Sequence, residues 1–291
     1  AQLAELPATA DPDLATEATL AQTLRVLGAL ETLPAIPVLI PPPGQRQAGN
    51  PAPGRATDPP ADETARQLER VRALLAKAES TTYEAEAEAL TAKAQELITR
   101  HALARLLTRA GDARRAPAVV SRRIWIEAPY VMAKGMLVDA VAGANRCRAV
   151  ISEHLGLVSL VGDPHDLDDV ELLATSLLVQ ADAAMLRHGR QTTRAGVSRT
   201  RAFRQSFLLS YAACIGERLR AAEDTALAEQ AARERLLPVL RAVTAEVDRE
   251  FARLFPRTVE KETRISDDRG WAAGRAAADL ALLDVHGQIA G

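Results

Sequence analysis

A proline-rich stretch near the start of the chain most limits how this protein folds. Residues 33–60 read "LPAIPVLIPPPGQRQAGNPAPGRATDPP". Proline fixes φ and lacks an amide donor, so this stretch neither continues a helix nor joins the interior of a sheet. We expect a proline-rich linker over 34–61 that separates a helical segment, residues 1–33, from the rest of the chain. A polyproline motif for a protein partner is the alternative.

The segment before the linker has a helical pattern. Leucines recur every three or four residues, as on one face of a helix, at Leu20, Leu24, Leu27, Leu30 and Leu33. This segment, with the linker, is where we expect a protein partner or a second copy of the chain to bind, through residues 1–60.

Composition favours helices in the remainder of the chain. Hydrophobic residues make up 47 % of the sequence but aromatic residues only 3 %, because alanine and leucine dominate. The net charge of -2 gives the whole chain no electrostatic reason to bind nucleic acid or anionic lipid.

Two cysteines, Cys147 and Cys214, form no CxxC pair and no disulfide framework, so we expect two buried thiols in a reducing compartment. No run of about 18 apolar residues indicates a membrane span, and no signal peptide opens the chain. We therefore expect a cytoplasmic protein with no membrane partner.

Residues 62–109 are expected to form a helical hairpin domain. One helix is predicted over 63–79, a second over 83–100, and a short further turn over 102–109. Between the helices, Thr81 and Glu84 have the spacing of a capping box, in which the hydroxyl and the carboxylate satisfy each other's terminal amides.

Residues 118–291 are expected to form a second domain. Strands are predicted over 119–127, 147–154 and 155–163, and helices over 129–145, 166–188, the stretch after 198, 222–255 and 265–283. Pro238 is expected to break or kink the helix over 222–255. The fold class is therefore α+β, predominantly α: a helical hairpin followed by a small antiparallel sheet packed by long helices.

The hairpin resembles a short bacterial and phage domain of unknown function. Its hallmark is an LLxKAxS turn followed by EAExxxxKAxELxxxH, matched here by Lys77, Ser80, Glu86, Lys93, Glu96 and His101. The stretches "ANRCRAV", "FRQSFLLSYAACIGERL" and "GWAAGRAAADLALL" are similar to those of longer bacterial members, so the resemblance covers roughly 62–283. It implies an architecture and no mechanism.

The polar motif residues have ordinary structural interpretations. We expect His101 to end the second hairpin helix, where a cation interacts favourably with the helix dipole. Lys77 and Lys93 are expected to pair with Glu79, Glu86 or Glu96 within the hairpin.

A weak metal site is one alternative in the second domain. His154 and His165 flank a predicted strand and are candidate ligands together with Asp163 or Asp166. The other interpretation is that the acids of "GDPHDLDDVE" cap the helix that they begin. No motif assigns a catalytic residue or a cofactor.

Residues 187–204, "RHGRQTTRAGVSRTRAFR", contain no carboxylate, and we call them the basic segment. Arginine suits phosphate because its planar fork donates two hydrogen bonds at once. The candidate contacts are Arg187, Arg190, Arg194, Arg199, Arg201 and Arg204. The part from Gly189 to Gly196 is expected to be mobile and to become ordered on a ligand. The alternative is a solvated loop whose arginines pair with Asp168, Asp169, Glu171 or the acidic hairpin.

Two arginines fall on the apolar side of the helix after 198. Arg204, Tyr211 and Arg218 are spaced by seven and share a narrow arc with Phe207 and Ile215. An arginine there needs a carboxylate or a bound anion. We expect Asp139 or Asp182 as the partner, and otherwise an anion site around these three residues.

Three functions remain open. The first is a non-enzymatic protein that associates with nucleic acid through the basic segment. The second is an interaction scaffold that uses residues 1–60. The third is a metal-dependent hydrolase of unrecognised type at the acidic helix start.

Overall fold

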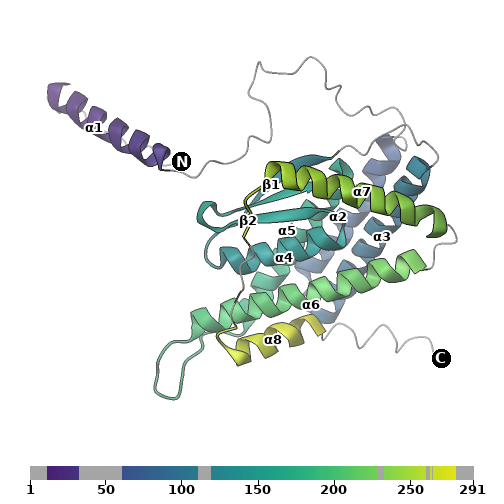
Figure 1. Cartoon of the computed structure of the whole chain (residues 1–291). Helices are drawn as coiled ribbons and strands as arrows, with labels where there is room; N and C mark the ends of the chain where they lie inside the picture. The colour runs from purple at the N-terminus through teal and green to yellow at the C-terminus, as the bar shows by residue number, and fades with distance from the viewer. Residues whose placement is uncertain are drawn as a thin grey trace, which may run out of the picture. The chain divides into compact units, whose positions relative to one another are not determined.

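The computed structural model describes residues 12–32, 61–110, 119–228, 233–259, 263 and 265–279 (Figure 1). The chain divides into two units, Ala1–Pro42 and Pro43–Gly291. Apart from its last residue, the linker expected over 34–61 lies outside the described residues.

Helix α1 spans Pro12–Glu31 and confirms the helix expected in the first unit. Four of its large apolar side chains are exposed: Leu20, Leu24, Val26 and Leu27. None of the described helices is both long and apolar enough to cross a lipid bilayer.

The second unit opens with the expected hairpin, α2 (Ala61–Ser80) and α3 (Glu84–Ala110). The predicted separate turn over 102–109 is wrong, because α3 runs through it. Ala102, Leu103 and Leu106 are buried, so the apolar period of the helix continues beyond residue 100.

The sheet is three-stranded and antiparallel, in the order β1-β3-β2, as the fold-class prediction requires. Its strands are β1 (Val120–Trp125), β2 (Arg148–Ser152) and β3 (Leu157–Gly162), with a short 3-10 helix, η1 (Glu153–Leu155), between the last two. Every residue of the central strand β3 is buried, which explains its continuous apolar sequence.

Helices cover both faces of this sheet (Figure 1). On one face, Val158 and Leu160 of β3 belong to the main core with α4 (Val131–Ala144) and α5 (Pro164–Arg187). On the other face, Val161 packs with α7 (Arg233–Leu254) and the end of α3.

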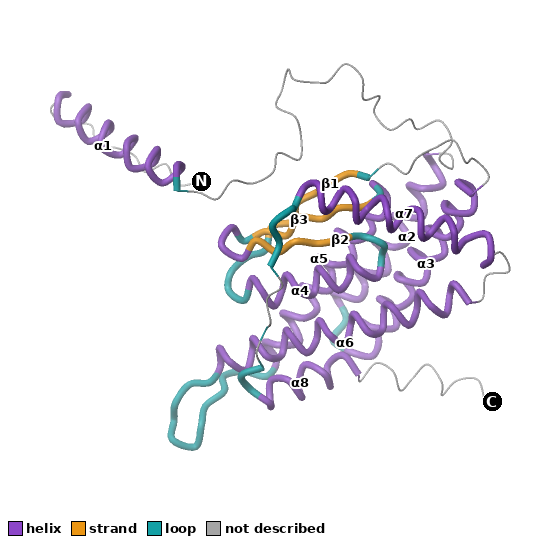
Figure 2. The backbone as a smooth tube through the Cα atoms, in the orientation of Figure 1, coloured by secondary structure: helices purple, strands orange, loops and turns teal. Residues whose placement is uncertain are grey.

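Helices α6 (Thr200–Ala228) and α8 (Asp268–Asp279) lie side by side (Figures 1 and 2). Two glycines of α8 face the backbone of α6. A Cβ atom on Gly270 would lie 2.3 Å from the carbonyl oxygen of Phe203, and one on Gly274 would lie 2.3 Å from that of Phe207.

The prediction of a single helix over 222–255 is wrong. Helix α6 continues to Ala228, and α7 begins at Arg233. Pro238 lies inside α7 and does not end it. Proline removes one backbone hydrogen bond there, but Leu236, Val243 and Val247 are buried against the core, and this packing holds the helix through the proline.

Candidate functional site

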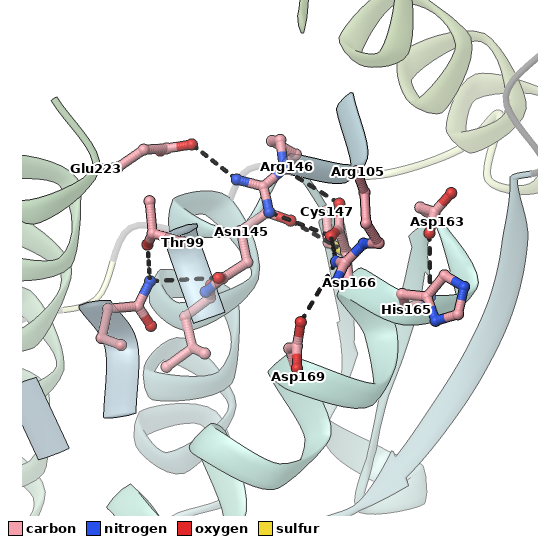
Figure 3. A network of polar contacts seen from close by, with 12 residues as sticks. Thr99, Arg105, Asn145, Arg146, Cys147, Asp163, His165, Asp166, Asp169 and Glu223 are labelled. Atoms are coloured by element: carbon pink, nitrogen blue, oxygen red, sulfur yellow. Dashed lines mark hydrogen bonds and ion pairs between the residues drawn. The ribbon is translucent and has the colours of Figure 1, made fainter. Parts of the chain in front are cut away.

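A network of charged side chains lies at the start of α5 (Figure 3). Arg146, in the turn between α4 and β2, donates to both oxygens of Asp166, over 3.1 and 3.2 Å, and to Glu223 of α6 over 3.0 Å. Arg105 of α3 lies 2.9 Å from Asp166 and 3.5 Å from Asp169. The network therefore joins the hairpin to α4, α5 and α6.

Burial and charge set the protonation of this network. Burial opposes the charge on Arg146, but the carboxylates of Asp166 and Glu223 together outweigh it and raise the pKa of the guanidinium. Burial likewise opposes ionised Asp166, but Arg146 and Arg105 outweigh it and lower the pKa of that carboxyl.

Two neighbouring groups, the Asp169 carboxyl and the Cys147 thiol, have raised pKa values. Burial raises the pKa of Asp169 to about 6, with Arg105 opposing and Asp166 adding to the rise. Burial also raises the pKa of the Cys147 thiol well above its ordinary value, so the thiol stays protonated. Cys147 and Cys214 are both free and buried, as expected.

The acidic start of α5 is committed to structural contacts. Asp163 caps the helix by accepting from the His165 amide over 3.1 Å. Asp168 and Glu171 pair with Arg122 of β1, each at 2.7 Å. These acids therefore do not neutralise the basic segment, contrary to one of the sequence alternatives.

The histidines proposed as weak metal ligands are not brought together. His154 lies in η1 before β3, whereas His165 follows the far end of that strand. His165 instead lines a small cleft with His101, Arg105, Asp168 and Asp169. Within the ranges that the structure describes, no group of three or more His, Cys, Asp or Glu is arranged to hold a metal ion.

His101 does not end a helix, so the dipole interpretation is wrong. It lies inside α3, which continues for nine more residues to Ala110 (110 − 101). The side chain faces the cleft with His165 instead.

The other motif residues hold the turn of the hairpin together. Lys77 pairs with Glu86 at 2.9 Å, and the Thr81 hydroxyl donates to Glu86 over 2.6 Å. Ser80 donates to the Lys77 carbonyl over 3.0 Å. The carboxylate that meets Thr81 is thus Glu86, while the side chain of Glu84, the expected partner, is outside the described part. Lys93 pairs with Glu96 at 2.6 Å, as expected.

The basic segment forms the end of α5, a loop and the start of α6. We call residues 188–199 the basic loop; it projects beyond the helices (Figure 2). It has internal order: Thr192 and Ser198 form a β-bridge, and the Val197 carbonyl accepts from the Thr193 amide over 2.9 Å. Gly196 has a φ of +79°, a conformation that suits glycine at a tight turn.

The arginines of the segment differ in their surroundings. Arg199 pairs with Asp267 at 3.1 Å and donates to the Ser266 carbonyl, so it holds the base of the loop. The side chains of Arg190, Arg194 and Arg201 are exposed, and no described residue pairs with them. Arg187 is exposed at the end of α5.

Arg218, on the apolar side of α6, has a partner from the hairpin. It pairs with Glu88 of α3 and donates to the Ala278 carbonyl of α8. The expected partner Asp182 pairs with Lys134 at 3.0 Å instead. An internal carboxylate does pair with Arg218, as the sequence predicted, but the carboxylate is that of Glu88.

Arg204, on the same side of α6, differs from Arg218. Its Nε atom is buried without a hydrogen-bond partner in the described part. The other expected partner, Asp139, faces different cations: burial raises the pKa of its carboxyl, and Arg148 and Arg220 oppose the rise.

A second cleft lies beside the hairpin turn, and we call it the turn cleft. Helices α5, α6 and α8 line it together with both sides of the turn. Tyr211 and Arg187, both candidates from the sequence, contribute to its wall. The structure therefore brings Arg187 and Tyr211 together but commits Arg218 to Glu88.

Sequence reasoning missed four charged residues that these sites use: Glu88, Arg105, Arg146 and Glu223. A signal existed for two of them, because Glu88 is the second Glu of the EAE motif and Arg146 lies within "ANRCRAV". Nothing local distinguished Arg105 or Glu223, since their partners are distant in sequence.

Comparison with known proteins gives one partial match. Residues 66–105 match a family described as "Protein of unknown function (DUF2786)", and these residues lie in α2 and α3 and end at Arg105. No curated protein and no solved structure matches the chain.

Proposed function

We propose that this protein is non-enzymatic and associates with nucleic acid by contacting phosphates through the basic segment. The observation that carries the proposal is the projecting basic loop, where Arg190 and Arg194 are exposed and have no ion-pair partner among the described residues. Arg201, at the first turn of α6, is likewise exposed and has no ion-pair partner among the described residues.

Local charge outweighs the net charge for such contacts. Interactions between exposed charges fall off over about 10 Å at ordinary ionic strength, and the basic segment contains no carboxylate. The acids at the start of α5 are paired with Arg105 and Arg122 and lie at the opposite end of that helix from the basic segment. A phosphate chain thus meets uncompensated guanidinium groups, which donate two hydrogen bonds each.

The test is a fluorescence anisotropy titration of a labelled oligonucleotide at low and high salt. We expect affinity to fall with salt, because bound phosphates release counterions. The triple variant Arg190→Ala, Arg194→Ala, Arg201→Ala should bind at least about tenfold more weakly and show a salt slope reduced by about 2–3. Arg199 is left in place because its contact with Asp267 holds the loop.

A matched control removes the same charge elsewhere. Arg72, Arg249 and Arg253 are exposed and each pairs with a glutamate three residues earlier. Replacing all three with alanine should leave the salt slope unchanged. Absence of binding at low salt, or equal losses in the two triple variants, contradicts the proposal.

A second function, self-association through residues 1–60, is favoured by the exposed apolar residues of α1. Leu20, Leu24 and Leu27 lie on one side of that helix and are 51–67 % exposed. Such a stripe buries apolar surface when two helices pair. Sedimentation of the full chain and of a chain lacking residues 1–60 checks this: loss of a dimer on deletion supports it, and an unchanged assembly state opposes it.

The resemblance to the longer bacterial members concerns the architecture of the chain and not its activity. Beyond the matched residues 66–105, the similarity to longer bacterial members extends to about residue 283 and takes in both the hairpin over 62–109 and the region over 118–291. The two buried free thiols fit a cytoplasmic location.

A further inference from the structure

The turn cleft adjoins the basic segment through one residue. Arg187 ends α5, lines the cleft and begins the basic segment. Arg187 therefore connects the wall of the cleft to the basic loop along the chain. A ligand that reaches into the cleft past Arg187 has its outer end beside that cationic surface.

The inner wall of the turn cleft is small and apolar on one side. Alanines from α2, α3, α5 and α8 contribute to it: Ala78, Ala87, Ala183, Ala184 and Ala277. The ring of Tyr211 closes another side and is held parallel to Phe207, at 6.3 Å between centroids. Small side chains and a fixed aromatic ring suit a flat, apolar-faced ligand.

The polar groups of the cleft mostly accept hydrogen bonds. Gln180 donates to Thr91 over 3.1 Å and to Ser176 over 3.2 Å, which fixes its amide. The Thr91 hydroxyl has one hydrogen and donates it to the Ala87 carbonyl over 2.8 Å, so its 3.4 Å contact with the Gln180 oxygen is weak. That oxygen, with Glu79 in the same wall, is available to accept from a ligand, whereas Glu88 is paired with Arg218.

The positions of the acceptors in the cleft and of the cation at its edge indicate which kind of ligand fits. The Glu79 carboxylate and the Gln180 oxygen in the cleft wall accept from the amino groups of a base and disfavour a phosphate, whereas Arg187 at the edge favours a phosphate. We propose that the turn cleft binds a nucleobase of a single-stranded nucleic acid whose backbone lies along the basic loop. This inference rests on the proposed function, because the backbone contacts are those of the basic segment.

The experiment compares two strands with the same phosphates. One is a single-stranded oligonucleotide rich in adenine and cytosine, and the other is a strand of abasic sites of equal length. The full chain should bind the base-bearing strand about tenfold more tightly, since stacking and edge contacts with a base are lost in the other.

Filling the cleft provides the variant. Ala183 is exposed on α5 and lines the cleft, so Ala183→Phe obstructs it without disturbing the core. The matched control is Thr175→Phe, which adds the same ring at another exposed position of α5 that lies outside the cleft. We expect Ala183→Phe to bind both strands with the affinity that the full chain has for the abasic strand, and Thr175→Phe to keep the tenfold preference.

The outcomes separate the two proposals. If the full chain binds the strands equally, or if Ala183→Phe keeps the preference, the cleft does not take a base, and phosphate binding by the basic loop still stands. If neither strand binds at low salt, both proposals are wrong.

Discussion

Arg146 is enclosed by protein yet remains charged, because carboxylates from two helices face it. Its side chain is 5 % exposed, and it contacts Asp166 and Glu223 at 3.0–3.2 Å. The residue has a φ of +59°, a left-handed conformation that is uncommon for a long side chain. At the scale of single residues, the fold thus accepts backbone strain to bring this guanidinium between two carboxylates.

Removing Arg146 should destabilise the protein strongly. Arg146→Ala leaves the buried Asp166 and the partly buried Glu223 with fewer partners, and we expect a loss of about 3–5 kcal/mol in the free energy of unfolding. Urea denaturation measures it. Arg122→Ala, which breaks the more exposed pairs with Asp168 and Glu171, should cost at most about 1 kcal/mol. Equal losses in the two variants would contradict the importance assigned to the buried network.

Asp169 should make stability depend on pH in the unusual direction for a carboxyl group. Its pKa is raised to about 6 in the folded protein, against about 4 when unfolded. Between these values the folded state holds the proton more tightly, so this group's contribution to stability falls as pH rises from about 4 to 6.

The variant Asp169→Asn keeps the shape of the side chain and removes the charge. We expect it to match the original protein near pH 4 and to exceed it by about 2 kcal/mol above pH 6. Urea unfolding across this pH range checks the difference. Asp168→Asn, on a half-exposed neighbour, should change stability by no more than about 1 kcal/mol at either end. A loss of stability in Asp169→Asn at pH 7 would show that its ion pair with Arg105 dominates instead.

At the scale of elements, α8 depends on close contact with α6. Gly270, Gly274 and Ala278 are four apart, so they share one side of α8, and the two glycines meet the α6 backbone. Arg218 of α6 then donates to the Ala278 carbonyl near the end of α8. The spacing of small residues therefore determines how near the two helices lie.

A methyl group at this contact should separate the helices. Gly274→Ala places a Cβ atom 2.3 Å from a carbonyl oxygen of α6, and we expect a loss of about 1–3 kcal/mol from overpacking. Gly143→Ala in α4 is the control, because nothing lies within 4 Å of its added methyl group. That change should stabilise by about 0.5–1 kcal/mol through helix propensity. Thermal unfolding distinguishes the two, and a stabilised Gly274→Ala would contradict the close contact.

At the scale of the whole second unit, the hairpin and the rest share one core. Val71 and Leu75 of α2 and Ala94 and Ile98 of α3 belong to the same buried cluster as α4, α5 and α6. The buried pairs of Arg105 with Asp166 and of Arg218 with Glu88 cross the same boundary. These contacts couple the stability of the hairpin to that of the elements that follow it.

A substitution in the hairpin should therefore destabilise both parts together. Leu75→Ala is expected to cost about 2–5 kcal/mol and to lower the unfolding midpoint seen by tryptophan fluorescence as much as that seen by circular dichroism. The fluorescence reports the region after the hairpin, because Trp271 packs against the main core. A fluorescence midpoint that does not move would instead favour independent domains over 62–109 and 118–291.

Local pattern accounts for the parts of the fold that were predictable. Apolar periodicity placed the hairpin, the three strands and α4 to α8, because those signals come from neighbours in sequence. It failed at the end of α3, which the buried Leu103 and Leu106 extend, and at the end of α6, where Ala226 and Leu227 pack partly buried against the second core cluster. Helix ends depend on what the last turn packs against, and one sequence does not reveal that.

The candidate sites also have a part that follows from local sequence and a part that depends on tertiary contacts. The sequence by itself determined the α+β class and the basic segment, since a run of arginines without carboxylates is a local property of the chain. Only the tertiary structure decided which charges stay exposed: it paired Arg218 with Glu88 and enclosed Arg146 with Asp166, while leaving Arg190 and Arg194 on the basic loop. The physical reason is that a charge within the fold requires a partner, and folding brings that partner from a distant helix.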